Sequence, residues 1–371
     1  MNQAEKDLAK IAEDEKTEPS EDSPYQKWVA SQGIPIIREF YIEDLRKVEL
    51  APWDWKGGRG AYMNLLGTGD INDAYLLEIA PGECVKPQRL LFEELIFVVE
   101  GSGSTTLWND ENKKVSFEWE AGSLFSPPVN TWRQHFNGSG EKPCRFLVVT
   151  SAPPLINLFR NMDFILNNPF PFNDRFSGEA DSFSGKGEFY EGRKKTVGAT
   201  KSWATNFVPD VRSIPLYEWS SRGAGGSYIG IELAENSMTA HVSQFPVGTY
   251  KKAHRHGAGA HVVIIGGEGY SLMWPEGQPI QRFDWRDGSV VVPPDGWYHQ
   301  HFNTGNTPAR YLALRWGSRK HPRPWTGGKD SGIDQNVKSG GSQIEYADED
   351  PQIRRMFEES LAKNGVVCKM K

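Results

Sequence analysis

The sequence predicts a mostly β protein in which one domain has been duplicated. Its 38 glycines and 24 prolines exceed the roughly 12 % that these two residue types usually supply, which indicates many turns. The 19 phenylalanines, 12 tyrosines and 13 tryptophans indicate short aromatic-rich strands between those turns rather than disorder. The third observation is an internal repeat, which sets the number of domains.

The repeat is clearest between Gly122–Asn137 (GSLFSPPVNTWRQHFN) and Gly288–Asn303 (GSVVVPPDGWYHQHFN). The two segments align without a gap at an offset of 166, and 8 of their 16 positions are identical. Asp44–Arg46 resembles Asp210–Arg212 at the same offset. Because the offset stays nearly constant over a hundred residues, we expect two copies of one domain.

The first half of the chain divides into an arm and a domain. Residues 1–33 are expected to form an N-terminal arm, which begins with a polar, charged and frayed helical stretch, and residues 34–151 the first domain. Within that domain, Asn109–Asn112 is typical of a hairpin tip. Short apolar runs predict strands at Ala74–Ile79, Leu95–Val99, Ser123–Ser126 and Phe146–Thr150.

Residues 152–204 are expected to connect the domains, with a helix over Leu155–Asn167 followed by a Gly- and Ser-rich stretch. Residues 205–317 form the second copy, and residues 318–371 a tail. Within the tail, Pro351–Lys363 is expected to be a helix, because Asp350 is a suitable N-cap and Gly365 a suitable stop.

Composition and charge restrict the function. A net charge of −6 argues against nucleic-acid binding, which needs a basic face, and no apolar run approaches the roughly 20 residues that a membrane helix requires. Cys84, Cys144 and Cys368 lie far apart, as is usual in a reducing compartment, and the N-terminal stretch has no secretory signal pattern. We therefore expect a cytoplasmic protein without nucleic-acid or membrane partners.

Five of the eight histidines fall between residues 254 and 301, all in the second copy. His254 and His256 form an H-x-H pair, which places both imidazoles on one side of an extended segment. Converging neutral imidazoles suit a divalent transition metal. The sequence therefore predicts a metal site from His254, His256, His261 and His299, although scattered surface or core histidines are the alternative.

The first copy lacks this histidine set. Counted from the shared Glu-Gly, Lys86 and Gln88 occupy the H-x-H positions, Glu93 or Glu94 stands for His261, and Arg133 stands for His299. Lys and Arg cannot ligate a cation, so we expect a metal-free first copy. A contact between Arg133 and a carboxylate would take the place of the ion.

These motifs resemble those of the cupin superfamily, and the duplication resembles a bicupin. Gly248–His261 follows the first cupin motif except that His261 stands where the family has Glu, and Gly288–Asn303 matches the second motif in full. The resemblance implies an all-β fold of two tandem antiparallel cupin barrels (double-stranded β-helix, jelly roll), with short helices in the connector and at the C-terminus. The metal would lie inside the second barrel.

The resemblance to all-histidine cupin centres, such as those of gentisate and hydroxynaphthoate dioxygenases, implies an Fe(II) dioxygenase. It would cleave a C–C bond of an acidic aromatic or enolisable small molecule, with O2 as the second substrate. Mn, Zn, Ni or Cu are alternatives to iron. A Mn, Zn or Ni decarboxylase, isomerase or lyase that needs no O2 is a second reading, and a non-catalytic ligand-binding bicupin is a third.

Further residues are candidates for the same site. His241, Gln300 and His301 are expected near the metal as acid–base or orienting groups, although His301 has the counterpart His135 and is then structural. The substrate candidates are one cation for a carboxylate and three aromatic residues for a planar molecule: Arg315, Trp274, Trp297 and Tyr298. Bicupins often associate through their arms, so a homo-oligomer is also expected.

Overall fold

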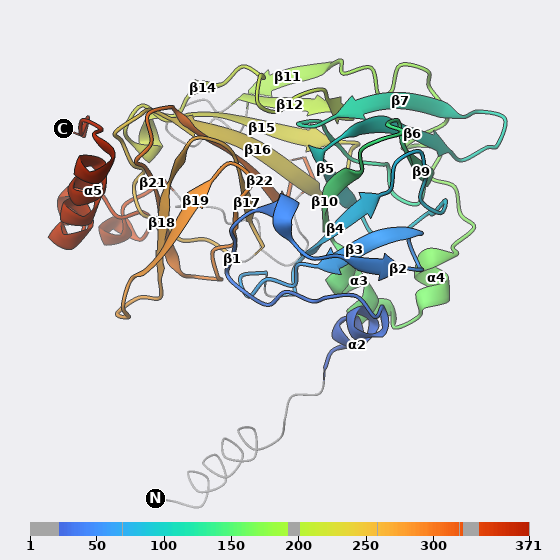
Figure 1. Cartoon of the computed structure of the whole chain (residues 1–371), viewed down its shortest axis with the longest axis horizontal. Coiled ribbons are helices and arrows are strands. Elements are labelled where there is room, and N and C mark those ends of the chain that lie inside the picture. The colour runs from blue at the N-terminus through green and yellow to red at the C-terminus, as the bar shows by residue number, and fades with distance from the viewer. Residues whose placement is uncertain are drawn as a thin grey trace, which may run out of the picture.

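The computed structural model of the chain describes residues 22–68, 70–191, 201–257, 259–318, 320–321 and 334–370. It confirms the all-β prediction: two barrels of antiparallel strands lie side by side, and few helices accompany them (Figure 1). The predicted frayed stretch at the start of the arm lies almost entirely outside the described residues. No helix in the described part of the chain is both long and apolar enough to cross a membrane.

The first barrel consists of a seven-stranded sheet facing a three-stranded sheet. The large sheet has the order β13 (Phe207–Val208), β8 (Leu124–Phe125), β5 (Glu94–Glu100), β10 (Cys144–Thr150), β4 (Asp73–Ile79), β3 (Gly58–Tyr62) and β2 (Ala51–Trp53). The small sheet has the order β7 (Val115–Glu120), β6 (Ser102–Trp108) and β9 (Trp132–Asn137). All four strands predicted in this domain are present within a residue or two of their expected ends.

The second barrel repeats this plan. Its large sheet has nine strands: β1 (Tyr41–Ile42), β20 (Val290–Val291), β17 (His261–Gly266), β22 (Ala309–Trp316), β16 (Met238–Phe245), β15 (Ser227–Leu233), β12 (Lys201–Thr205) and β11 (Gly187–Glu191), with β14 (Tyr217–Glu218) beside β15. Its small sheet has the order β19 (Gln281–Arg286), β18 (Glu268–Trp274) and β21 (Tyr298–Asn303). Strands β11 and β12 lie in the segment that was expected to be a connector.

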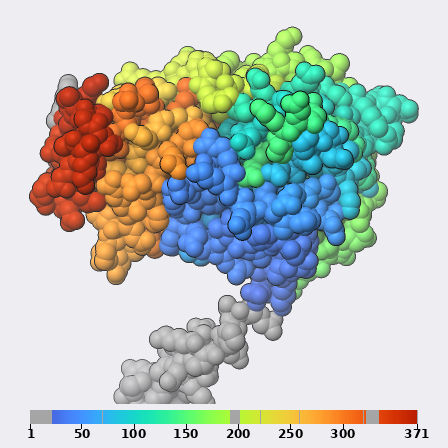
Figure 2. All heavy atoms as spheres, in the orientation of Figure 1, coloured from blue at the N-terminus to red at the C-terminus, as the bar shows by residue number. Residues whose placement is uncertain are grey.

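Each barrel takes one strand from the other copy. Strand β1, from the start of the chain, pairs with β20 of the second barrel, and β13, from the start of the second copy, pairs with β8 of the first. In Figure 1 the blue strand β1 lies against the orange second barrel, and in Figure 2 the blue N-terminal segment fills the junction between the two halves. The two copies are therefore joined by reciprocal strand pairing.

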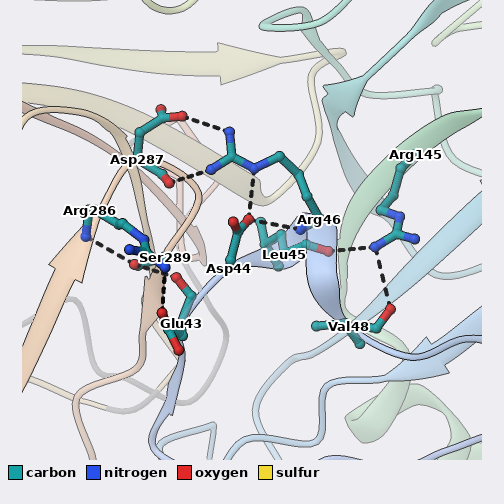
Figure 3. Close-up of polar contacts among 9 residues, drawn as sticks. All are labelled: Glu43, Asp44, Leu45, Arg46, Val48, Arg145, Arg286, Asp287 and Ser289. Atoms are coloured by element: carbon teal, nitrogen blue, oxygen red, sulfur yellow. Dashed lines mark hydrogen bonds and ion pairs between the residues drawn. The ribbon is translucent and has the colours of Figure 1, made fainter.

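The short helical segment η1 (Leu45–Lys47) shows how this junction is fastened (Figure 3). Arg46 donates to Asp44 on its own segment and to the side chain and backbone carbonyl of Asp287 in the second barrel. The Ser289 hydroxyl donates to the carbonyl of Glu43 over 2.6 Å. The matching serine of the first barrel, Ser123, donates to the carbonyl of Pro209 over 2.7 Å, so the junction repeats at the offset of 166.

Helices cover the ends of the molecule. Helix α2 (Pro24–Ser31) packs on α3 (Ala152–Phe159) beside the first barrel. The single helix predicted over Leu155–Asn167 is instead α3 and α4 (Met162–Leu166), because Arg160 adopts a left-handed conformation (φ 52°) that ends α3. Helix α5 (Pro351–Asn364) confirms the predicted C-terminal helix, with Asp350 at its N-cap and Gly365 (φ 66°) at its C-cap.

The core has four parts. One lies between the large sheets of the two barrels and includes Leu76, Leu147, Ile231 and Leu312. A second fills the first barrel, and a third fills the second barrel around Tyr311. The fourth lies on the outer face of β18 and β21, where α5 covers Tyr270, Tyr298 and Phe302 with Ile353, Phe357 and Leu361. Alternate residues of β21 therefore face the barrel interior and α5.

Candidate metal centre

Three histidines converge inside the second barrel. His299 on β21 and His254 on the preceding extended segment form a backbone bridge, with N–H···O distances of 2.9 and 3.1 Å. Their rings lie 4.1 Å apart, and the ring of His256 lies 5.5 and 4.7 Å from the rings of His254 and His299. The potential ligand nitrogens of the three residues all lie within 4.8 Å of one another.

The outer nitrogens of these rings support a metal at their centre. The Nδ1 atoms of His254 and His299 lie 3.4 Å from the carbonyls of Lys252 and Trp297, and Nδ1 of His256 lies 2.8 Å from its neighbouring carbonyl. A carbonyl at Nδ1 fixes the tautomer whose Nε2 lone pair is free to ligate. The three imidazoles therefore fit a divalent transition metal bound through Nε2.

Burial also keeps these rings in the ligating form. Desolvation, together with neighbouring cations and imidazoles, holds the pKa of His254 and of His299 well below the usual value. A metal ligand must be neutral imidazole, so the fold supplies the required protonation state.

The structure places His261 outside this group. Val262 and Ile264 of β17 face the interior of the second barrel, whereas Val263 and Ile265 face the core between the barrels, and His261 shares their parity. His261 is fully buried, and neither ring nitrogen makes a hydrogen bond among the described residues. Burial lowers the pKa of His261 to about 4.

The first barrel explains this placement through its register. Ile96 pairs with Phe125 as Val262 pairs with Val291, so residues 96 and 262 correspond at the offset of 166. His261 then corresponds to Leu95, and the counterpart of the buried carboxylate Glu94 is Ala260. The second barrel therefore has a methyl group where the first has a carboxylate.

In the first barrel, Glu94 is held by cations instead of a metal. Arg133 makes an ion pair with it, as predicted, Lys56 lies 3.5 Å away, and the Tyr75 hydroxyl donates over 2.5 Å. Although burial raises the pKa of Glu94, the two cations outweigh it and lower that pKa to about 2. The alternative carboxylate, Glu93, instead accepts hydrogen bonds from Ser237 and Met238 of the second copy.

One correspondence predicted from the sequence is wrong. Gln88 forms a bridge with Arg133 as His254 does with His299, so the offset of 166 also holds in this segment. Gln88 therefore corresponds to His254, and Leu90 corresponds to His256. The sequence had instead matched Lys86 to His254 and Gln88 to His256. The expected match was counted from Glu100-Gly101 and Glu268-Gly269, which are offset by 168 residues, whereas the strands around them are offset by 166.

Three cations lie in or beside the interior of the second barrel. Arg222 is buried, lies over Trp219, makes an ion pair of 3.2 Å with Asp334 and donates to Gln343. Arg222 lowers the pKa of both His254 and His299, which shows that its charge reaches the centre.

The other two cations are Arg315 on β22 and Lys251. Arg315 shares its face of β22 with Tyr311 and Ala313 in the barrel interior, and its Nε is buried without a hydrogen-bond partner among the described residues. Lys251 is fully buried, with a side-chain amine 2.5 Å from Ser243 Oγ and 3.0 Å from the Tyr311 hydroxyl. One buried carboxylate, Glu232 on β15, shares this interior face, because Ile231 and Leu233 face the core between the barrels. With Arg222 paired to Asp334, Lys251 and Arg315 still outnumber Glu232, so the interior favours an anion.

His241 and His301 both lie near this interior. The rings of His241 and His301 lie 5.9 and 5.3 Å from the ring of Tyr311, and the ring of His301 lies 5.8 Å from that of His299. His301 Nδ1 contacts Ser271 Oγ over 2.7 Å, and His135 Nδ1 contacts Thr105 Oγ1 over the same distance in the first barrel. That shared contact supports a structural role for His301.

The remaining predicted residues face elsewhere. Gln300 lies on the opposite face of β21 from His299 and donates to Glu349 over 3.2 Å. Trp274 and Tyr298 stack on each other under α5, and Trp297 packs against Phe40. The strand alternation thus directs Gln300, Trp274 and Tyr298 away from the three histidines, whereas Trp297 shares the parity of His299 and packs against the apolar cluster of the second barrel.

Two features of the site were not predicted from the sequence. Arg222, Lys251 and Tyr311 were missed, although comparing the two copies at constant offset would have identified them. The tail was also missed: Gln343 forms a bridge with His254, and Ile344 N donates to Ala253 O, so residues 342–344 lie against the H-x-H segment.

Comparison with known proteins gives distant structural matches alone. No family model and no curated protein matches the chain. Among solved structures, two single-residue variants of Bacillus subtilis oxalate decarboxylase are similar at 13 % and 12 % identity, with TM-scores of 0.47 and 0.48. Each match covers 76 % of this chain and 78 % of the other. Another structure of the same enzyme concerns its Mn(II) centres.

Proposed function

We propose that the protein is a metal-dependent enzyme whose second barrel acts on a small carboxylic acid. The observation that carries the proposal is the convergence of His254, His256 and His299 in a buried interior lined by cations. When bound, a divalent metal there would supply Lewis acidity toward a chelating oxygen. Because an imidazole ligand carries no charge, the ion would keep its full charge and favour an anionic ligand.

The residues around the centre indicate where the acid binds. In the first barrel, Glu94 pairs with Thr150 across β5 and β10. In the second barrel His261 pairs with Leu314, so the preceding residue, Ala260, stands opposite Arg315. The substrate carboxylate would fill the space that Glu94 occupies in the first barrel, with Arg315 as its partner. Arg315 would therefore supply the positive charge of this ion pair, and the substrate carboxylate the negative charge.

The reaction class that this interior supports best is an O2-independent decarboxylation, isomerisation or lyase reaction through an enolate. Arg222, Lys251 and Arg315 would stabilise negative charge as it develops on the substrate. Burial of Arg222 and Lys251 would strengthen their interactions. Mn, Zn or Ni would suffice for such chemistry.

An Fe(II) dioxygenase is the second candidate, because three neutral ligands leave positions for both a chelating acid and O2. Anaerobic purification, elemental analysis and reconstitution with Fe(II) or Mn(II) separate the two classes. Fe(II)-dependent O2 consumption with hydroxybenzoates, catechols or diketones would support the dioxygenase. Turnover of 2-oxo acids by the Mn(II) protein without O2 would support the enolate reaction.

Two matched variants test the site itself. His256→Ala should abolish stoichiometric metal binding, whereas His321→Ala changes a half-exposed histidine outside the barrel interior and should leave it intact. Arg315→Leu should keep the metal and raise KM for the acid by about 10- to 100-fold, as expected for losing one charge-assisted contact. A protein that binds the acid equally well without metal would support the non-catalytic reading.

A further inference from the structure

Tyr311, Lys251 and Ser243 form a buried cluster, of which the proposed function uses only the charge of Lys251. Lys251 donates to both hydroxyl oxygens, at 2.5 Å to Ser243 and 3.0 Å to Tyr311, and the Ser243 hydroxyl donates onward to the carbonyl of Ser227 over 2.9 Å. The Lys251 amine also lies 4.8 Å from the centre of the Tyr311 ring. Each group therefore has a defined orientation.

The first barrel shows that the fold itself does not require this cluster. At the offset of 166, Ser243 corresponds to Leu77 and Lys251 to Val85, and at the offset of 165 in the last strand Tyr311 corresponds to Phe146. Leu77, Val85 and Phe146 all line the small cavity inside the first barrel. Three apolar positions have thus become a lysine, a serine and a tyrosine in the barrel that holds the histidines.

Burying an ammonium group has a cost that hydroxyl groups and aromatic rings offset only in part. Lys251 is 1 % exposed, and no described carboxylate forms an ion pair with it. Its neighbours are the two hydroxyls and the rings of Trp219, Phe245 and Tyr311. An unpaired buried cation is strongly unfavourable unless an anion accompanies it at some stage of function.

We propose that Tyr311 donates a proton to the substrate enolate and that Lys251 stabilises the resulting phenolate. This inference rests on the function proposed above. The O–H bond of Tyr311 breaks and its electron pair stays on the phenolate oxygen, while the proton forms a new bond to the substrate carbanion carbon. Solvent then reprotonates Tyr311, so the step needs no other reactant.

The surroundings of Tyr311 suit a proton donor. Its oxygen accepts a hydrogen bond from Lys251, so its own proton is directed elsewhere. Burial alone would raise the pKa of Tyr311, but the Lys251 ammonium, the Ser243 hydroxyl and Arg222 together outweigh burial, and that pKa lies below its usual value. The titratable or charged groups that face Tyr311 come from four elements: Lys251, His241 on β16, His301 on β21 and Arg222 on η2 (Ser220–Arg222).

Deuterium exchange into pyruvate tests the proposal without requiring the natural substrate. The Mn(II) protein is incubated with pyruvate in D2O, and loss of the methyl signal is followed by NMR. In this exchange a methyl C–H bond breaks, the proton passes to the Tyr311 phenolate and leaves the enolate, and Tyr311, after exchanging with solvent, returns a deuteron to the same carbon. Tyr311→Phe should slow the exchange by at least about 100-fold while the metal content and the affinity for pyruvate stay unchanged. Lys251→Met should slow it similarly, and Tyr270→Phe, on the outer face of the small sheet under α5, should not.

The outcomes separate this proposal from the function on which it rests. Metal and pyruvate binding without exchange in the unmodified protein, or full exchange in Tyr311→Phe, would overturn the role of Tyr311. Loss of pyruvate affinity in Lys251→Met with normal exchange at saturation would make Lys251 a substrate anchor and contradict its role beside the phenolate. Absence of bound metal would instead overturn the metal centre.

Tyrosinate absorbance gives a readout that needs no metal. Titration of the metal-free protein at about 295 nm, where tyrosinate absorbs, should show one tyrosine that ionises before the others, and Tyr311→Phe should remove it. The same early ionisation in both proteins would contradict the coupling between Tyr311 and Lys251, whatever the metal content.

Discussion

At the scale of single residues, two equivalent positions distinguish the barrels. Arg133 and His299 occupy equivalent sites on β9 and β21, and Glu94 and Ala260 occupy equivalent sites beside them. The first barrel satisfies its carboxylate with a guanidinium, and the second replaces the guanidinium with an imidazole and removes the carboxylate. With the same backbone arrangement, the first barrel contains an internal ion pair at these positions, and the second contains two uncharged residues.

His299→Ala and His261→Leu should have opposite effects. His299→Ala removes a ring from the convergent group, so metal binding should fall by more than about 100-fold. His261→Leu introduces the residue found at the equivalent Leu95 position and removes a buried imidazole without hydrogen bonds. It should retain the metal and raise the free energy of unfolding by about 1 kcal/mol, measured by urea denaturation. Metal loss in His261→Leu would return His261 to the ligand set.

Arg133→Met should strongly destabilise the first barrel. It leaves Glu94 buried beside Lys56 alone, and removing one partner of a buried ion pair costs about 3–5 kcal/mol. The double variant with Glu94→Leu should recover much of that loss, because it removes the stranded charge. Equal stability of the single and double variants by urea denaturation would contradict this account.

At the scale of elements, helix α2 is attached to the first barrel through a buried carboxyl group. The Tyr25 hydroxyl donates to Asp73 over 2.6 Å, and Asn64 donates to the same oxygen over 3.0 Å. Burial outweighs these hydrogen bonds and raises the pKa of Asp73 to about 7. The carboxyl group is therefore protonated in the folded protein over a pH range in which it ionises in the unfolded chain.

This raised pKa predicts that the folded state loses stability as the pH increases. The contribution of Asp73 is fully present below its unfolded pKa near 3.8 and is lost as the pH rises through about 7. Between about pH 5 and pH 8 the wild type should lose about 3 kcal/mol relative to Asp73→Asn, which cannot ionise. Parallel pH profiles of the two proteins in urea denaturation would contradict the assignment.

The serines at the junction offer a second test at this scale. Ser289→Ala and Ser123→Ala each remove one hydrogen bond from a barrel to the segment of the other copy that pairs with it. Each should lower the free energy of unfolding by about 1 kcal/mol, and the two effects should add because the sites lie in different barrels. Differential scanning calorimetry of the single and double variants measures both quantities.

At the scale of the whole molecule, the two barrels should unfold as one unit. Each large sheet includes a strand from the other copy, and the apolar core between the sheets draws residues from both. Disrupting either barrel therefore exposes apolar surface on the other. Calorimetry should show one transition with equal calorimetric and van't Hoff enthalpies, whereas two separate transitions would contradict this prediction.

Association of copies belongs to the same scale and stays a prediction. The sequence favours a homo-oligomer through the terminal arms, and α5 lies at the opposite end of the molecule from the first barrel (Figure 1). Light scattering of the full chain should give a mass of at least two copies, and a mass near 41.7 kDa would contradict it.

The sequence alone determined the β class, the duplication, the C-terminal helix and the identity of the three converging histidines. These features depend on local patterns: turn residues, a constant offset, a capped amphipathic segment and the alternation of side chains along an extended chain. His254 and His256 share one face of an extended segment because side chains alternate along it. The repeat makes His299 the equivalent of Arg133 in the first copy.

The tertiary structure decided those features that depend on how strands distant in the sequence pair with one another. His261 faces the core between the barrels because β17 pairs with β20 and β22 in one register, and a shift by one residue would turn it into the interior. The same alternation sends Gln300 toward α5, and the tail brings Asp334 and Gln343 against Arg222 from more than a hundred residues away. Such contacts depend on where strands pair, which no short stretch of sequence encodes.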